Sequence, residues 1–300
     1  MPSTVTVGLD GSAESRAAAE WAAREAKLRG LPVKLVHVWE PVPDPMAQAP
    51  LLGAETLQHW TERVPREAAE GLRLRHPGVE VLTEQMSGRP AEALCAAAGD
   101  AELLVLGSRG LSGFGGFMVG SVGLAVVAHV ERPVVLVRAG EQAADEHRPD
   151  PAGIPSAAAP FRPVVLGLDP ANTSEALLAF AFDAAARRGT SLRIVHGWSL
   201  PPYYGVSLAP EPDVRTLERT EAAAVTDLVA PWRTKFPDVE VTEESHLGSA
   251  VEQLIGASRD ASLVVVGRRV RRSPVGTHIG HITHAVLHHA VAPVAVVAHH

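Results

Sequence analysis

A glycine-rich segment, residues 107–121 with the sequence "GSRGLSGFGGFMVGS", has the composition of a loop that holds phosphate. It lies between an apolar strand-like run and an apolar helix-like run, and glycine loops at such junctions commonly bind phosphate through backbone N–H groups. The segment contains no lysine, which excludes the loop form G-x4-G-K-[ST]. The dinucleotide form G-x-G-x-x-G also fails, because Met118 stands where a third glycine would follow Gly113 and Gly115.

The spacing that remains is Gly107-x2-Gly110-x9-Gly120-Ser121. Gly107 ends the strand-like run, and Gly110 is free to adopt a positive φ that lets the backbone pass close to an anion. Gly120 and Ser121 open the helix-like run. Serine is a good N-cap, and a helix N-terminus offers unpaired N–H groups to phosphate. Arg109 adds a positive charge. Two interpretations stay open: an anion site, or a surface loop followed by an ordinary helix cap.

The chain contains an internal repeat, and one residue is gained in its second copy. Asp10 and Asp169 are 159 positions apart, whereas Gly107 and Gly267 are 160 apart. The segment 141–160 between the copies is rich in Pro, Ala and charged residues and is predicted to be a linker between domains at 1–140 and 161–300. The clearest repeated blocks are "VTVGLDGS" at 5–12 with "PVVLGLDP" at 163–170, "LVHVWEP" at 35–41 with "IVHGWSLP" at 194–201, and "AELLVLGSR" at 101–109 with "ASLVVVGRR" at 261–269.

Each copy alternates strand-like and helix-like segments. Alternation of this kind predicts parallel strands joined by right-handed crossovers, and the runs "ELLVL" and "PVVLV" are apolar throughout, as expected for strands covered on both faces. We predict for each copy a Rossmann-like α/β domain, with a five-stranded parallel sheet flanked by about four helices. In the first copy the predicted strands are 4–9, 33–38, 79–85, 102–106 and 133–137, and the predicted helices are 13–29, 54–75, 90–99 and 121–130.

In such a sheet, ligands bind at the carboxyl ends of the strands. Asp10, Val38 and Gly107 all stand at predicted strand ends and are therefore expected to border one site. Asp10 has two interpretations, as a carboxylate that accepts hydrogen bonds from ribose hydroxyl groups or as a helix N-cap. His37 and His196 repeat in mid-strand, where a hydrogen-bonded core histidine is the expected role.

The overall composition excludes several classes of function. A net charge of −7 argues against a nucleic-acid or membrane-surface role, and an aromatic content of 4% argues against base-stacking platforms. Cys95 is the only cysteine, so no intrachain disulfide forms. We expect no signal peptide, because the first residues lack a basic and an apolar region, and no apolar run of about 20 residues is found in the sequence. We therefore expect a soluble cytoplasmic protein without nucleic-acid or membrane partners.

The glycine loop, the "VGLDGS" start, the "HVW" strand end and the run "RPVVLVR" together resemble the universal stress protein family, in a form with two tandem domains. The resemblance implies an adenine nucleotide alpha hydrolase-like fold and ATP as ligand, with or without Mg²⁺, because the family's ATP-binding members carry G-x2-G-x9-G-[ST]. It implies that Asp10 contacts the nucleoside, that the backbone of Val38 contacts adenine, and that the loop surrounds ribose and phosphates. The implied site of the first copy is Gly8, Asp10, Val38, Gly107, Ser108, Arg109, Gly110, Gly120, Ser121 and Val122.

The second copy departs from this pattern. Pro170 replaces Gly11, Val270 stands in place of Gly110, and His281 replaces Ser121. A β-branched residue resists positive φ, so this loop differs from the first, although the run "RRVRR" at 268–272 offers positive charge to an anion. Retained and lost nucleotide binding both stay open here. The weaker candidate site of this copy is Asp169, Gly197, Gly267, Arg268 and Gly280.

A row of histidines, His278, His281, His284 and His288, shares one side of the last predicted helix. Imidazoles one helical turn apart are able to chelate a metal. No cysteine or carboxylate joins them, and the neighbouring His289 matches His129 of the first copy, which favours a structural role. We predict no metal site.

A nucleotide binder is the function that these features favour. The loop supplies no carboxylate for hydrolysis, so at most weak ATP hydrolysis is expected and the protein is not predicted to be an enzyme. The resemblance implies an ATP-dependent stress regulator or sensor. The alternatives are an assembly module with a vestigial loop and a slow ATPase. The last strands, at 134–138 and 294–298, lie at a sheet edge, and the resemblance implies that they pair the two halves of a chain and form a homodimer.

Overall fold

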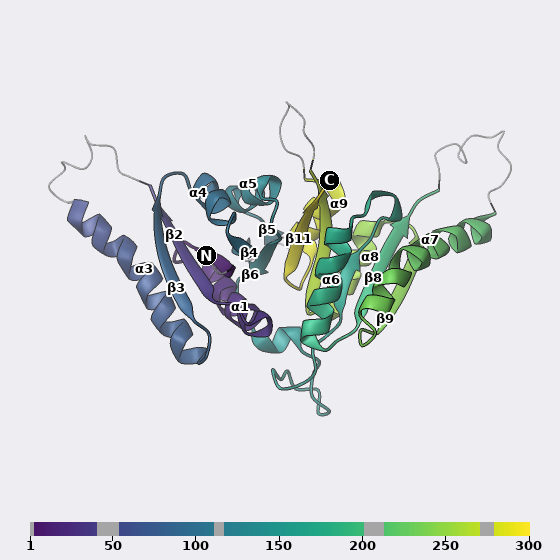
Figure 1. Cartoon of the computed structure of the whole chain (residues 1–300), viewed down its shortest axis with the longest axis horizontal. Coiled ribbons are helices and arrows are strands. Elements are labelled where there is room, and N and C mark those ends of the chain that lie inside the picture. The colour runs from purple at the N-terminus through teal and green to yellow at the C-terminus, as the bar shows by residue number, and fades with distance from the viewer. Residues whose placement is uncertain (1–2, 41–53, 111–116, 201–212, 271–278) are drawn as a thin grey trace. The chain divides into compact units, whose positions relative to one another are not determined.

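The computed structural model divides the chain into two compact units, Met1–Ala143 and Ala144–Arg271 with Ile279–His300. It describes residues 3–40, 54–110, 117–200, 213–270 and 279–300, with the backbone alone for 54–61, 109–110 and 117–118. Both units are α/β structures in which helices cover parallel strands (Figure 1). In the described part of the chain no helix is both long and apolar enough to span a bilayer.

The first unit is built on five parallel strands in the order β3-β2-β1-β4-β6. Helices α1 and α3 pack on one side of them and α4 and α5 pack together on the other, as the prediction of a doubly wound sheet requires. A short strand, β5, pairs antiparallel with the end of β4. The elements are β1 (Thr4–Leu9), α1 (Ala13–Arg29), β2 (Val33–Trp39), α3 (Ala54–Arg75), β3 (Val81–Ser87), α4 (Pro90–Ala97), β4 (Ala101–Gly110), β5 (Phe117–Met118), α5 (Ser121–His129) and β6 (Val134–Arg138).

Helix α1 begins and ends where the sequence chemistry dictates. Ser12 is its N-cap, and the Ser12 hydroxyl accepts a hydrogen bond from the backbone N–H of Ser15 at 3.1 Å. Gly30 closes the helix in the left-handed conformation with φ 66°, as predicted. The buried face carries six alanines and Trp21. These small side chains let the helix lie close to the strands, which matters for the site below.

The third strand begins two residues later than predicted. Gly78, with φ 93°, forms a turn after α3, and the backbone N–H of Val79 bonds to the carbonyl of His76. Val79 is buried although it precedes the strand. Because Val79 is apolar and buried, the apolar pattern of the sequence placed it in the strand. That pattern alone does not distinguish a buried turn residue from a strand residue.

The second unit repeats the first, with five parallel strands in the order β11-β10-β7-β8-β9. The prediction of two tandem five-stranded α/β domains is confirmed. The elements are β7 (Val164–Gly167), the 3₁₀ turn η2 (Pro170–Asn172), α6 (Glu175–Arg188), β8 (Leu192–Trp198), α7 (Val214–Lys235), β9 (Val241–Leu247), α8 (Ala250–Ala257), the 3₁₀ turn η4 (Ser258–Asp260), β10 (Leu263–Arg269), α9 (His281–His289) and β11 (Val294–His299).

The two units differ in the turn that follows their first strand. In the first unit Gly11 takes φ 81°, and α1 begins at Ala13. Proline holds φ near −65° and cannot copy that turn. In the second unit Pro170 instead opens η2, and α6 begins only at Glu175. The helix therefore starts three residues after Asp10 in one unit but six residues after Asp169 in the other.

The segment between the repeats is folded in part. From Ala144 onward it belongs to the second compact unit. His147 packs on Phe161 with ring centroids 4.0 Å apart, and the guanidinium of Arg162 donates to the carbonyl of His147 at 2.8 Å. The segment predicted as a linker thus contributes packing to the second unit over part of its length.

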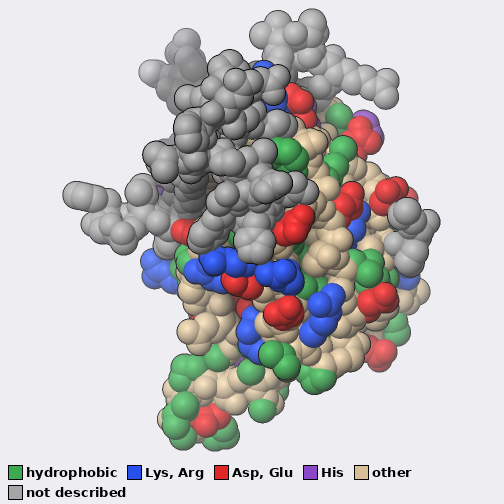
Figure 2. Space-filling model, turned by 90° about the vertical axis from the view of Figure 1, so that its left-hand side faces the viewer, with side chains coloured by type: hydrophobic (Ala, Val, Ile, Leu, Met, Phe, Trp, Pro, Cys, Tyr) green, Lys and Arg blue, Asp and Glu red, His purple; other side chains and the backbone are tan. Residues whose placement is uncertain are grey.

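Opposite charges alternate on the face formed by α3 and β3. Arg75 and His76 both contact the Glu20 carboxylate, and Lys34 contacts Glu84 at 3.0 Å. Figure 2 views the molecule from this side and shows Lys and Arg interspersed with Asp and Glu. A face of mixed sign is not the basic footprint that binds a nucleic-acid backbone.

Candidate functional site

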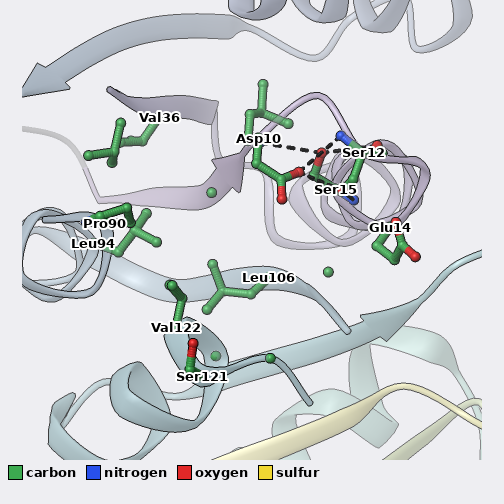
Figure 3. A pocket seen from close by; sticks show the side chains of 16 residues that line it. Asp10, Ser12, Glu14, Ser15, Val36, Pro90, Leu94, Leu106, Ser121 and Val122 are labelled. Atoms are coloured by element: carbon green, nitrogen blue, oxygen red, sulfur yellow. Dashed lines mark hydrogen bonds between the residues drawn. The ribbon is translucent and has the colours of Figure 1, made fainter. Parts of the chain in front are cut away.

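The first unit contains a cavity of about 270 Å³ at the carboxyl ends of β1, β2 and β4 (Figure 3). It lies at the switch point of the strand order, where ligands bind in doubly wound sheets. The walls come from the ends of these strands and from the first turns of α1, α4 and α5. The predicted site residues that the structure brings together around it are Gly8, Asp10, Val38, Gly107, Gly120, Ser121 and Val122.

Asp10 supplies an ionised carboxylate at the cavity wall. Its Oδ1 accepts hydrogen bonds from the backbone N–H of Ser12 at 3.0 Å and from the Ser12 hydroxyl at 2.5 Å (Figure 3). Partial burial acts to raise the pKa of Asp10, but hydrogen bonds from Ser12 and Ser15 outweigh it and hold the pKa below its usual range. The N-cap of α1 is Ser12, so Asp10 is not the helix N-cap that was its second interpretation.

His37 fixes the end of β1 from the neighbouring strand. Its Nδ1–H donates to the carbonyl of Leu9 at 2.9 Å, and His196 repeats the bond to Leu168 at the same distance. Both rings are buried. The predicted role of hydrogen-bonded core histidines is confirmed, and in the first unit it holds the residue that precedes Asp10.

Gly107 is required by the packing of α1 as well as by its place in the cavity wall. A Cβ at this position would lie 2.5 Å from the carbonyl carbon of Glu14 and 2.7 Å from the backbone nitrogen of Ser15. The first turn of α1 therefore rests on the end of β4, backbone against backbone. The sequence interpretation placed this glycine at a strand end beside a candidate anion site, and the structure adds the close packing of α1 as a reason for it.

The first turn of α5 faces the cavity through Ser121, Val122 and Gly123. Gly120 is the N-cap and offers no side-chain hydrogen bond, and Ser121 is the first helical residue. The expectation that Ser121 is the N-cap is therefore wrong by one position. Because the first N–H groups of a helix have no partner within it, this end presents donors and a favourable dipole to an anion.

Three of the predicted site residues, Ser108, Arg109 and Gly110, are not among the described residues that line the cavity. The Ser108 side chain is buried and its hydroxyl donates to the Val137 carbonyl at 3.2 Å, so only its backbone is left for a ligand. Arg109 and Gly110 are described by their backbone, which pairs with β5. Residues 111–116 of the glycine loop lie outside the described residues. Contacts of the Arg109 side chain stay a prediction.

Sequence reasoning missed much of the apolar wall. Val36 follows from its spacing, because it lies two residues before Val38 on the same face of β2. Pro90 and Leu94 come from α4, whose position over the strand ends depends on tertiary packing. Glu14 comes from the first turn of α1 that contacts Gly107.

In the second unit the predicted residues occupy altered surroundings. Both Asp169 carboxylate oxygens accept bonds inside η2, from the Ala171 N–H at 3.0 Å and the Asn172 side chain at 2.8 Å. Gly280 is the N-cap of α9, as Gly120 is of α5. Arg268 is buried in β10. Gly197 and Gly267 stand at the ends of β8 and β10, where their neighbours differ from those in the first unit.

The histidines of α9 were considered as metal ligands, and no metal site was predicted there. His284 and His288 stand with ring centroids 4.5 Å apart. Among the described residues no group of three or more His, Cys, Asp or Glu could hold a metal ion, and His278 lies outside those residues.

Two copies of a five-stranded parallel α/β domain, one with a glycine-bordered cavity at its switch point, place the molecule among the doubly wound α/β proteins. The chain belongs to the universal stress protein family, since the model of that family matches residues 1–138 and again residues 160–298. The predicted resemblance to a tandem-domain universal stress protein is thereby confirmed.

Known proteins of the family match nearly the whole chain or one half of it. A universal stress protein of Mycolicibacterium smegmatis is 32% identical, covering 98% of this chain and 96% of its own. The crystal structure of a universal stress protein from Archaeoglobus fulgidus is 17% identical, covers 98% of each chain and superposes with a TM-score of 0.69, which supports the fold. A universal stress protein solved in complex with cAMP is 26% identical over 46% of this chain and 98% of its own, with a TM-score of 0.35.

Proposed function

We propose that the first domain binds ATP and that the protein acts as a nucleotide-dependent regulator or sensor in the cytoplasmic response to stress. The observation that carries this proposal is that three different recognition elements border one cavity. An apolar slot from Val36, Val38 and Pro90 suits a purine base, the Asp10 carboxylate suits ribose hydroxyl groups, and the N-terminus of α5 suits phosphate. The sequence spacing Gly107-x2-Gly110-x9-Gly120-Ser121 adds the family's ATP motif.

Binding without turnover is the better match to the described side chains. The ionisable groups in the described cavity wall are Asp10 and Glu14, and the rest of that wall is apolar, glycine or serine. Phosphoryl transfer needs a base aligned with the attacking group and cations around the transferred phosphate. Two carboxylates instead repel the phosphates, so a divalent cation such as Mg²⁺ carried by the nucleotide would favour binding. A slow ATPase is the alternative, tested by turnover with Mg²⁺.

An assembly module with a vestigial loop is the other alternative. It would use the strands at 134–138 and 294–298 for pairing within and between chains. Native mass spectrometry of the purified protein separates the two proposals, because it reports bound nucleotide and the number of chains together. A homodimer without nucleotide favours assembly, and bound adenine nucleotide favours the regulator.

The proposal is tested by thermal unfolding and calorimetric titration with ATP, cAMP and GTP. A ligand at 100 times its Kd stabilises a protein by about 2.7 kcal/mol, so ATP should raise Tm by several degrees and GTP should not. The Asp10→Ala variant should weaken ATP binding at least tenfold. Asp150→Ala is the matched control, because one carboxylate oxygen of Asp150, like Oδ1 of Asp10, accepts two hydrogen bonds in a turn, here from the backbone N–H groups of Ala152 and Ile154.

Equal shifts with ATP and GTP, or ATP binding unchanged in Asp10→Ala, would refute the proposed site. Calorimetry is run below the unfolding range of each variant, so that a loss of binding is not confused with a loss of folding.

A further inference from the structure

The end of the base slot is built differently in the two domains. In the first domain Val38, at the end of β2, and Pro90, at the start of α4, both border the cavity. The matching residues of the second domain are Gly197 and Ala250. A Cβ on Gly197 would lie 2.4 Å from the Cα and 2.7 Å from the Cβ of Ala250, closer than real side chains approach. Helix α8 therefore starts in direct contact with the end of β8, at the place where Val38 and Pro90 border the cavity of the first domain.

The carboxylate that would meet the ribose is also engaged differently. In the first domain Ser12 uses only Oδ1 of Asp10. In the second domain both oxygens of Asp169 accept hydrogen bonds within η2, the turn that Pro170 opens. A ribose hydroxyl would have to compete with these two bonds, whereas Asp10 keeps capacity to accept.

The neighbour of the glycine at the end of β4 differs from that of its counterpart at the end of β10. In the first domain the backbone of Glu14 rests against Gly107. Because α6 starts late, the position beside Gly267 is instead filled by the His299 ring, whose Nε2 would lie 2.9 Å from a Cβ there. The matching residue of the first domain is Ala139. Burial lowers the pKa of His299, so its ring is neutral near pH 7 and adds no charge for a phosphate.

The chain also takes a different path after β10 than after β4. The backbone N–H of Val270 donates to the carbonyl of His299 at 2.6 Å, which keeps the chain alongside β11 after β10 has ended. In the first domain the matching residue, Gly110, pairs with β5. At the helix beyond, His281 is the first residue where Ser121 stands in the first domain.

From these differences we infer that the second domain is closed to adenine nucleotide by Ala250, η2 and His299, and that each chain binds one nucleotide, in the first domain. The inference rests on the proposed function of the first domain. It makes the two halves of the chain unequal, because only the first domain would bind nucleotide.

A matched pair of substitutions tests the inference in the full-length protein. Ser121→Glu and His281→Glu each place a carboxylate at the first residue of a helix, α5 or α9, where phosphate would bind. Both parent residues are exposed and a glutamate there favours the helix dipole, so folding is preserved. ATP binding is measured by calorimetry and native mass spectrometry, with melting curves as the check on folding.

The expected stoichiometry of the wild type is one ATP per chain. Ser121→Glu should weaken ATP binding at least tenfold, and His281→Glu should leave both affinity and stoichiometry as in the wild type. Two ATP per wild-type chain, one of them kept in Ser121→Glu and lost when His281→Glu is added, would overturn the inference while the proposed function stands. A single ATP that His281→Glu removes and Ser121→Glu does not would overturn both. A wild type that binds no ATP would overturn both.

Discussion

Replacing Gly107 with alanine should test how α1 is held on β4. The new Cβ would lie 2.5 Å from the carbonyl carbon and 2.7 Å from the carbonyl oxygen of Glu14. Both are backbone atoms of the first helical turn, and they move only if α1 shifts or the end of β4 bends. Gly267→Ala is the matched control. Its nearest neighbour is the ring of His299, at 2.9 Å, which is the flexible end of a side chain.

Steric overpacking of a well-packed region costs about 1–3 kcal/mol. The contact with helix backbone places Gly107→Ala at about 3 kcal/mol, and the movable ring places Gly267→Ala at about 1 kcal/mol or less. For a chain segment of this size, each kcal/mol corresponds to roughly 2–4 °C in Tm. Gly107→Ala should therefore lower the Tm of the first domain by roughly 6–12 °C.

Urea and thermal unfolding followed by circular dichroism measure the two changes, and hydrogen exchange shows where each change lies. Amides in the first turn of α1 should exchange faster in Gly107→Ala, whereas β8 and β9 should be unaffected. Equal destabilisation by the two substitutions, or a neutral Gly107→Ala, would refute the claim that the helix rests on this glycine. ATP binding should fall in the same variant, because the shifted turn carries Ser12 and borders the cavity.

Two further predictions concern the cap of α1 and an ion pair of the second domain. Ser12→Ala removes the N-cap of α1 and a donor to Asp10, so it should cost about 1 kcal/mol and raise the pKa of Asp10, measured by urea unfolding and by NMR titration. Hydrogen bonds from the Arg193 guanidinium hold the pKa of Glu244 below its usual range. The stability gained is therefore present above the unfolded pKa and is lost as pH falls through the folded pKa. Glu244→Gln should lower Tm at pH 7, and the Tm difference should shrink as the pH falls below the usual pKa of a glutamate. A Tm difference that stays constant down to acid pH would contradict the assignment.

The part of the site that the sequence predicts is the part that topology brings together. Asp10, Val38 and Gly107 each end a strand, and parallel strands end at one edge of a sheet, so their proximity follows from the strand assignment alone. Pro90 and Leu94 carry no such signal, because the position of α4 over that edge depends on how its apolar face packs. The helix start at Ser121 is as predicted, but its N-cap is Gly120 and not Ser121, since glycine and serine are both acceptable caps.

Gly107 and its counterpart Gly267 are each closely packed, but against different neighbours. The change from Gly11 to Pro170 explains this difference. Pro170 cannot adopt the φ of 81° that Gly11 takes, so the turn after β7 becomes 3₁₀ and α6 starts late. The helix backbone that rests on Gly107 is then absent beside Gly267, and the His299 ring fills that place. The second copy therefore keeps two glycines of the motif in sequence, although the residues around them differ from those in the first domain. We therefore expect that Pro170→Gly alone leaves the second domain unable to bind ATP, because the contact between Ala250 and Gly197 at the base site is unchanged.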